Sequence, residues 1–138
     1  MMNAVAPLDP LTEAFSALVA RDDALTRRRF YDVLLTSRLY MTVTDDRSAV
    51  TGKALRLRDG TIALPAFLDE TALRSWISSP TRYGTMSAKA FFSGAAKMEI
   101  DAVVINPGGP ALQINRPSII LLGQGLNPAA IPQGPLSD

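Results

Sequence analysis

Hydrophobic side chains recur at helical spacing through the first third of the chain. Asp9 and Pro10 suit the start of a helix, because an aspartate caps the first turn and a proline fits the first helical position. The apolar residues that follow share one helix face: Leu11, Phe15, Leu18 and Val19. A second helix is predicted to start near Thr26, with Leu25 packed against Phe30 across its first turn.

Beyond residue 38 the apolar positions alternate, which is typical of strands. Residues 39–43 are predicted to form one strand. Asp59-Gly60 is the usual sequence of a two-residue hairpin turn, in which the glycine has a positive φ. This pairing places four apolar side chains on one buried face, namely Leu55, Leu57, Ile62 and Leu64.

Capping residues and short apolar runs indicate the remaining elements. Asp69 and Ser87 are each expected to cap a helix. Two more strands and a short final helix are predicted at residues 82–85, 100–105 and 117–122. Gly123 is expected to end the final helix. The last strand, helix and strand would form a right-handed crossover.

This order of elements predicts one α+β domain over residues 1–125. Its sheet is expected to be mixed and mostly antiparallel, with about five strands covered by about four or five helices. Residues 126–138 contain Pro128, Pro132 and Pro135, and they are predicted to form a proline-rich C-terminal tail.

The most informative segment lies where a buried strand ends. The apolar run of residues 103–105 is followed by five turn-forming residues, Asn106-Pro107-Gly108-Gly109-Pro110. Pro107 is expected to hold Asn106 in an extended conformation, and the two glycines can take a positive φ or admit a close neighbour. Two interpretations stay open: a binding loop at a strand end, or a rigid corner in which Asn106 bonds to its own turn.

Two aromatic residues flank the segment 78–80. Trp76 and Tyr83 are candidates for a binding surface, because both residue types are frequent at interaction hot spots. The alternative for Trp76 is the core, since Leu73 shares its helix face. Together with the turn, the candidate binding residues are Asn106, Gly108, Gly109, Tyr83 and Trp76.

Composition narrows the chemistry. The chain of 138 residues has no histidine and no cysteine, which excludes Ser-His-Asp and Cys-His catalysis, thiol redox chemistry and disulfides. The same absence argues against structural zinc. Carboxylate pairs such as Glu99 and Asp101 are interpreted as loop groups. No catalytic residue, metal ligand or cofactor is therefore predicted, and a non-catalytic role is favoured.

The charge balance and the termini indicate the setting. A formal net charge of +1 gives no field that favours nucleic acid or an anionic membrane. Arg27–Arg29 and the pair Arg56 and Arg58 are interpreted as solvated faces. No apolar run approaches the ~20 residues that span a bilayer, and the N-terminus lacks a signal-peptide pattern. We expect a cytoplasmic protein whose partner is another protein or a second copy in a homodimer.

Three segments carry a resemblance to a known family. They are residues 27–40 with Phe30-Tyr31-Asp32-Val33-Leu34-Leu35-Thr36-Ser37, residues 59–76 with Leu64-Pro65-Ala66-Phe67-Leu68-Asp69, and residues 105–123 with Ile105-Asn106-Pro107-Gly108-Gly109-Pro110. In this order they resemble the N-terminal domain of the SseB family. The resemblance implies a bacterial protein that the family name links to enhanced serine sensitivity. It implies no enzymatic activity, so no catalytic residue is carried over.

Two functions stay open. The first is a non-catalytic protein-interaction or accessory module of the SseB-like type. The alternative is a small-molecule binding domain with an amino-acid-related ligand, or an unrecognised enzyme, that uses the turn at residues 106–110. A deep pocket beside the glycines with a carboxylate of perturbed pKa would favour the alternative, and a flat surface would favour the first.

Overall fold

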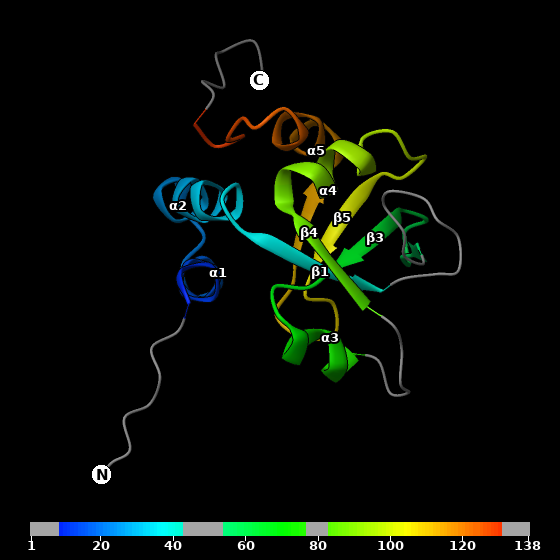
Figure 1. The fold of residues 1–138 in the computed structure, drawn as a ribbon, viewed down its shortest axis with the longest axis horizontal. Helices are drawn as coiled ribbons and strands as arrows, with labels where there is room; N and C mark the ends of the chain where they lie inside the picture. Colours follow the sequence, from blue (N-terminus) through cyan, green and yellow to red (C-terminus); the bar gives the residue numbers. More distant parts are fainter. Residues whose placement is uncertain (1–8, 43–53, 77–82, 131–138) are drawn as a thin grey trace.

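The computed structural model describes residues 9–42, 54–76 and 83–130 (Figure 1). Its helices there are α1 (Pro10–Ala20), α2 (Ala24–Leu34), α3 (Glu70–Trp76), α4 (Ala88–Ala95) and α5 (Arg116–Gly123). Its strands there are β1 (Arg38–Thr42), β2 (Leu55–Arg56), β3 (Ile62–Ala66), β4 (Tyr83–Ser87), β5 (Ala102–Ile105) and β6 (Leu112–Asn115). The α+β fold class is confirmed, with β6 as a strand that the sequence pattern did not predict.

The strands form a four-stranded sheet and a two-stranded ribbon. The sheet has the order β2-β3-β5-β6, in which β3 and β5 run parallel and the outer pairs are antiparallel. The ribbon pairs β1 with β4, and Tyr40 of β1 exchanges two backbone hydrogen bonds of 2.8 and 2.9 Å with Phe67 at the end of β3. The predicted crossover from β4 to β5 is wrong, because β4 and β5 belong to different sheets.

Local capping sets where the helices begin. Asp9, Asp69 and Ser87 each accept a hydrogen bond from the backbone amide three residues later, at 2.9, 2.7 and 3.2 Å. These three predicted caps are confirmed. The start of α2 differs from the prediction, because Asp23 is its cap and Leu25 is 68% exposed. Leu25 therefore does not pack across the first turn.

The hairpin between β2 and β3 has a three-residue turn in place of the predicted two-residue turn. Gly60 has the expected positive φ, at 89°, but Leu57 N donates to Thr61 O at 2.8 Å, so three residues lie between them. Because side chains alternate along a strand, this shift moves Leu57 to the face opposite Ile62 and Leu64. The predicted single apolar face is therefore wrong.

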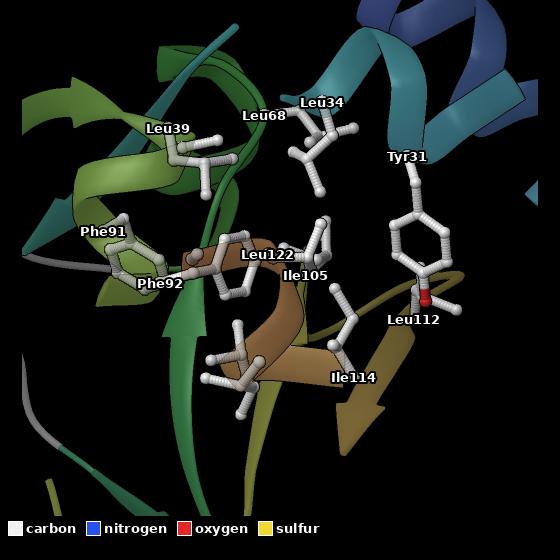
Figure 2. Packing of buried hydrophobic residues seen from close by; sticks show 14 of the residues in the cluster. Tyr31, Leu34, Leu39, Leu68, Phe91, Phe92, Ile105, Leu112, Ile114 and Leu122 are labelled. Atoms are coloured by element: carbon white, nitrogen blue, oxygen red, sulfur yellow. The ribbon is translucent and has the colours of Figure 1, made fainter. Parts of the chain in front are cut away.

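The main core lies between helices α1, α2, α4 and α5 and one face of the four-stranded sheet (Figure 2). Phe91 and Phe92 of α4 are fully buried and meet edge to face, with ring centroids 5.3 Å apart. The inward residues of the strands complete this cluster: Leu64, Ala66, Val103, Ile105, Leu112 and Ile114. This packing fixes the end of β5, and so it fixes the position of the turn that follows.

A close approach of α5 to α4 occurs at Gly123. A β-carbon on Gly123 would lie 2.9 Å from the Cα atom of Ser93 and 3.0 Å from its nitrogen. The turn that ends α5 is made by Gly125 instead, which has a φ of 82° and donates its amide to Leu122 O at 3.0 Å. The predicted role of Gly123 as the terminating glycine is therefore wrong.

Alanine at Gly123 is expected to lower the free energy of unfolding by about 1–3 kcal/mol, because the added methyl group meets backbone that cannot move aside cheaply. Urea unfolding measures the change. Gln124→Ala changes the exposed neighbour and is expected to stay close to the unsubstituted protein. Equal stability of the two variants would contradict this account of the contact between α4 and α5.

Residues 126–130 lie against α2. The side-chain amide of Asn127 donates to Arg28 O at 2.9 Å and to Asp32 Oδ1 at 2.7 Å, and Asn127 is 9% exposed. The predicted tail is described as far as residue 130, while residues 131–138 lie outside the described residues. Residues 43 and 82, the predicted ends of two strands, also lie outside them. The division after residue 125 stays a prediction.

Candidate functional site

The turn after β5 borders a cavity of about 600 Å³ between α1 and α3. Its walls come from α1 through Phe15, Ser16, Val19 and Ala20, from α3 through Ala72, Ser75 and Trp76, and from residues 106–110. Four of the five predicted binding residues line it: Trp76, Asn106, Gly108 and Gly109. We call this cavity the larger lobe of the α1–α3 groove.

A smaller lobe of about 240 Å³ adjoins the larger one at the same stretch of α1. The two lobes share Phe15, Val19 and Pro110, and Asp22 lies in the lining of the smaller one. Val19 shares the apolar face of α1 with the buried Leu11, Phe15 and Leu18, but it is itself 49% exposed. Sequence reasoning missed this wall of the groove, because nothing in the pattern of α1 indicates contact with a turn so far along the chain.

Asn106 links the ends of two strands. Its φ is 53°, so the predicted extended conformation is wrong. The backbone amide of Asn106 donates to Ala66 O at 2.8 Å, and its Oδ1 accepts from Leu68 N at 3.0 Å. Asparagine tolerates this left-handed conformation better than most residues. In place of the expected bond within its own turn, Asn106 makes two hydrogen bonds that hold the C-terminal end of β3 beside the C-terminal end of β5.

Gly108 and Trp76 fit against each other. Gly108 has a φ of 95° after Pro107, the pattern of a type II turn. A β-carbon on Gly108 would lie 2.7 Å from Trp76 Cδ1, whereas one on Gly109 would meet no described residue within 4 Å. Trp76 is half-buried, and its ring lies 5.6 Å from that of Phe67. The indole therefore packs on the fold and also forms a wall of the groove.

Tyr83 lies in a separate cluster and does not line either lobe. Its ring stacks on Tyr40 at 5.8 Å, and its hydroxyl donates to Glu70 Oε1 at 2.9 Å. That hydrogen bond to the carboxylate raises the pKa of Tyr83. Hydrogen bonds from Arg74 and then from Tyr83 lower the pKa of Glu70. The structure therefore does not join Tyr83 and Trp76 into one aromatic wall.

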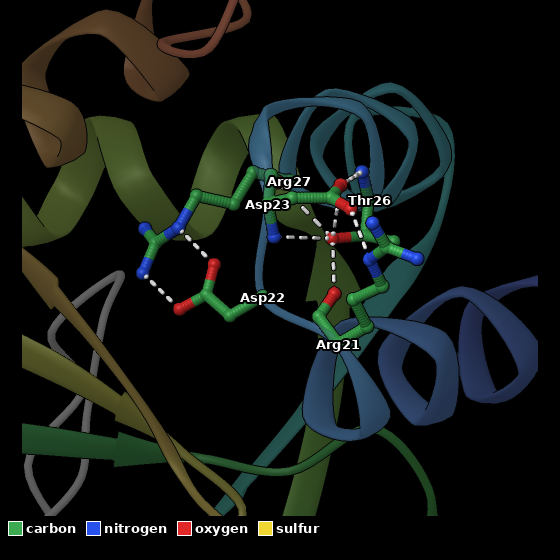
Figure 3. A network of polar contacts seen from close by, with 5 residues as sticks. All are labelled: Arg21, Asp22, Asp23, Thr26 and Arg27. Atoms are coloured by element: carbon green, nitrogen blue, oxygen red, sulfur yellow. Dashed lines mark hydrogen bonds and ion pairs between the residues drawn. The ribbon is translucent and has the colours of Figure 1, made fainter.

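The smaller lobe ends beside an ion pair between Asp22, in the connection from α1 to α2, and Arg27 of α2 (Figure 3). Arg27 Nε and Nη2 donate to the two Asp22 oxygens at 2.6 and 2.8 Å, which lowers the pKa of Asp22. In the same connection Asp23 and Thr26 form a reciprocal capping box, and Arg21 pairs with Asp23 at 3.1 Å. Arg27 is thus engaged within the chain.

Other carboxylates also have structural roles. Asp69 caps α3, and Asp101 Oδ2 accepts from the backbone amide of Ile62 at 2.9 Å. Glu99 is exposed beside the start of β5. Within the part of the chain that the structure describes, no three acidic side chains are grouped to hold a metal ion.

The larger lobe offers apolar surface and few polar groups. Its lining, as far as the described residues show it, contains no ionisable side chain, and its polar side chains are those of Ser16, Ser75 and Asn106. General acid–base catalysis needs a titratable group within reach of the reacting atom. Apolar walls with a few polar groups are typical of binding sites. The described lining suits an apolar occupant and contains no side chain that can act as a general acid or base.

Together the fold and the groove define a small α+β domain with a hollow beside a strand-end turn. A comparison with protein-family models matched residues 11–119 to the family described as SseB protein N-terminal domain. The chain therefore belongs to the SseB family. The matched range includes α1, α3 and the turn at residues 106–110, which are the three walls of the groove.

Two further comparisons, with curated proteins and with solved structures, found no match. None of the helices within the described ranges combines the length and the apolar character that crossing a bilayer requires.

Proposed function

We propose that the domain is a non-catalytic protein-interaction module that binds its partner through the α1–α3 groove. The observation that carries the proposal is the chemistry of the larger lobe, which is apolar and has no ionisable side chain among its described lining residues. Trp76 is a half-buried tryptophan at this site, and Val19 exposes a large apolar side chain to both lobes. Tryptophan is enriched among the residues that dominate binding energy at interfaces.

The alternative of an amino-acid-related ligand receives less support. A free amino acid brings an ammonium and a carboxylate, and burying these charges requires partners of opposite charge. Among the described residues, the larger lobe offers hydroxyl, amide and indole side chains for this purpose and no charged one. The carboxylate of perturbed pKa that would favour an enzyme lies in the smaller lobe, where Asp22 is bound by Arg27.

The cellular setting belongs to the same proposal. We place the protein in the bacterial cytoplasm, with a link to serine sensitivity, and membership of the SseB family supports this setting. The partner is another protein or a second copy of this chain. Exposed Ile120 on α5 and Leu126 just beyond it support self-association, at 40% and 44% exposure.

Val19→Glu is expected to abolish partner binding, because it places a charge on the apolar surface that both lobes share. The full chain, tagged, is used to capture its partner from native lysate, and the identified partner is then titrated with purified variants. Leu25→Glu makes the same substitution at a side chain that is 68% exposed and lines neither lobe, and it should bind normally.

Thermal unfolding must show that both variants are folded. Sedimentation of the purified chain identifies the case in which the partner is a second copy. A partner that binds Val19→Glu as tightly as the unsubstituted protein would overturn the assignment to the groove. Failure to recover any stoichiometric partner would count against an interaction module altogether.

A further inference from the structure

The two lobes of the groove lie side by side against the same two turns of α1, on either side of Phe15 and Val19. The larger is bounded by α1, α3 and the turn, and the smaller by α1 and the segment that leads into β6. Both are apolar over most of their lining, and Val19 borders both. A chain that follows the groove would therefore place one apolar side chain in each lobe, with the bulkier one in the larger lobe.

The segments that build the groove are acidic, although the whole chain is not. Residues 9–23 contain four acidic side chains and one basic side chain. Residues 69–76 contain two acidic side chains and one basic side chain, and residues 106–111 contain no charged side chain. Their net charge is −4, or −3 when Arg27, the partner of Asp22, is counted with them, against +1 for the complete chain. The remainder of the chain therefore carries +5 or +4, and the groove is set in an acidic part of a near-neutral protein.

Internal pairing leaves part of this charge available. Asp22 is bound by Arg27, Asp23 by Arg21 and Glu70 by Arg74, whereas Asp69 at the start of α3 has no ion-pair partner among the described residues. Glu13 lies one helical turn before Ser16 and is exposed, and within the described residues it has no ion-pair partner. Acidic segments beside a groove attract basic groups and repel phosphates, so they disfavour the binding of nucleic acids and anionic lipid surfaces.

We propose that the occupant of the groove is a segment of another protein with two apolar anchor residues flanked by lysine or arginine. The anchors fill the two lobes, and the basic flanks lie over the acidic segments of α1 and α3. This inference rests on the proposed function and adds the chemistry of the partner. Apolar contact supplies most of the affinity, and charge complementarity supplies selectivity and the rate of association.

Selection of a phage-displayed library of short random peptides on the full chain tests this chemistry. Peptides that also bind Val19→Glu are removed by counter-selection. Enriched peptides are expected to share two apolar residues and an excess of lysine and arginine. A neutral or acidic consensus would overturn the inference, as would a library that shows no enrichment. Sensitivity of the native partner to Val19→Glu alongside a consensus without basic residues would retain the proposed function and reject only this inference.

Charge reversal near the groove gives a second readout. An enriched peptide without tryptophan is titrated while the emission of Trp76, the single tryptophan of the chain, is followed. Glu13→Lys is expected to weaken binding about two- to fivefold at low ionic strength, and the difference should vanish near ~1 M salt. Glu99→Lys makes the same change on the connection between α4 and β5 and serves as the control. An equal effect of both substitutions, or none from Glu13→Lys, would reject the charge complementarity.

Discussion

Valine in place of Gly108 is expected to lower the free energy of unfolding by about 2–5 kcal/mol. Two separate costs contribute. A β-branched residue is strained at the φ of 95° that Gly108 adopts. Its β-carbon would also lie 2.7 Å from Trp76 Cδ1, and the indole cannot withdraw freely because it packs against Phe67. The fold therefore depends on glycine at this position.

Gly109→Val is the matched control, because it adds the same side chain one residue further along. Gly109 has no positive φ, and a β-carbon there would meet none of the described residues, so the expected change is within about 0.5 kcal/mol. Urea unfolding of the two variants measures the difference, and Trp76 emission shows whether the indole has moved. Similar losses at the two glycines would mean that the whole turn, and not the contact with Trp76, limits stability.

Gly108 is thus required for the fold, whereas Gly109 is free to vary, and this difference can be used to test function. A variant of Gly108 that fails to bind the partner is uninformative alone, since the wall formed by Trp76 moves with it. A variant of Gly109 that stays fully stable and still loses the partner would identify the turn as part of the binding surface. Comparing the two glycine variants therefore distinguishes a binding loop from a purely structural corner, the two interpretations that the sequence left open.

Helix starts could be predicted because a cap acts within a few residues. Asp9, Asp69 and Ser87 each bond to an amide three positions later, and no distant contact is needed. The hairpin register could not be predicted in the same way, because Asp59-Gly60 suits both two-residue and three-residue turns. Small apolar residues on the second face of the sheet accept Leu57 and make the three-residue turn compatible with burial.

In the candidate site, too, features set by neighbouring residues could be predicted and features set by distant contacts could not. The turn was recognisable from Asn106-Pro107-Gly108-Gly109-Pro110, since these residue types punctuate chains. The conformation of Asn106 was not, because its bond to Leu68 N crosses to a neighbouring strand and outweighs the local preference set by Pro107. The wall that α1 contributes depends on the packing of the whole domain, so a periodic pattern alone cannot indicate it.

The missed strand β6 had a weak signal in the sequence. Its residues alternate between buried and exposed, with Leu112 and Ile114 inward, which is the pattern of an edge strand. The strand has only four residues and follows a turn of glycines and prolines, so the alternation is too short to stand out. Its backbone pairing with β5 establishes it as a strand. The chain then continues directly into Arg116 at the start of α5.

Arg116→Met is expected to lower the free energy of unfolding by about 3–5 kcal/mol, a large share of the stability of a domain this size. The guanidinium donates to the carbonyl oxygens of Ala96, Met98 and Ile100 at 2.6, 3.1 and 3.0 Å. These carbonyls belong to the end of α4 and the connection into β5. Methionine keeps much of the side-chain volume but leaves all three acceptors without this donor.

Arg116→Lys tests whether the geometry of the guanidinium matters beyond its charge. A single ammonium on a flexible stem cannot reproduce the planar fork that reaches three carbonyls, so lysine is expected to restore only part of the loss. Urea unfolding at constant ionic strength measures both variants, and Arg58→Met, at an exposed arginine beyond β2, controls for loss of charge. Full recovery with lysine would show that charge near the end of α4 suffices. A stable Arg116→Met variant would show that water replaces the guanidinium without cost, and that the connection from α4 to β5 is held by apolar packing alone.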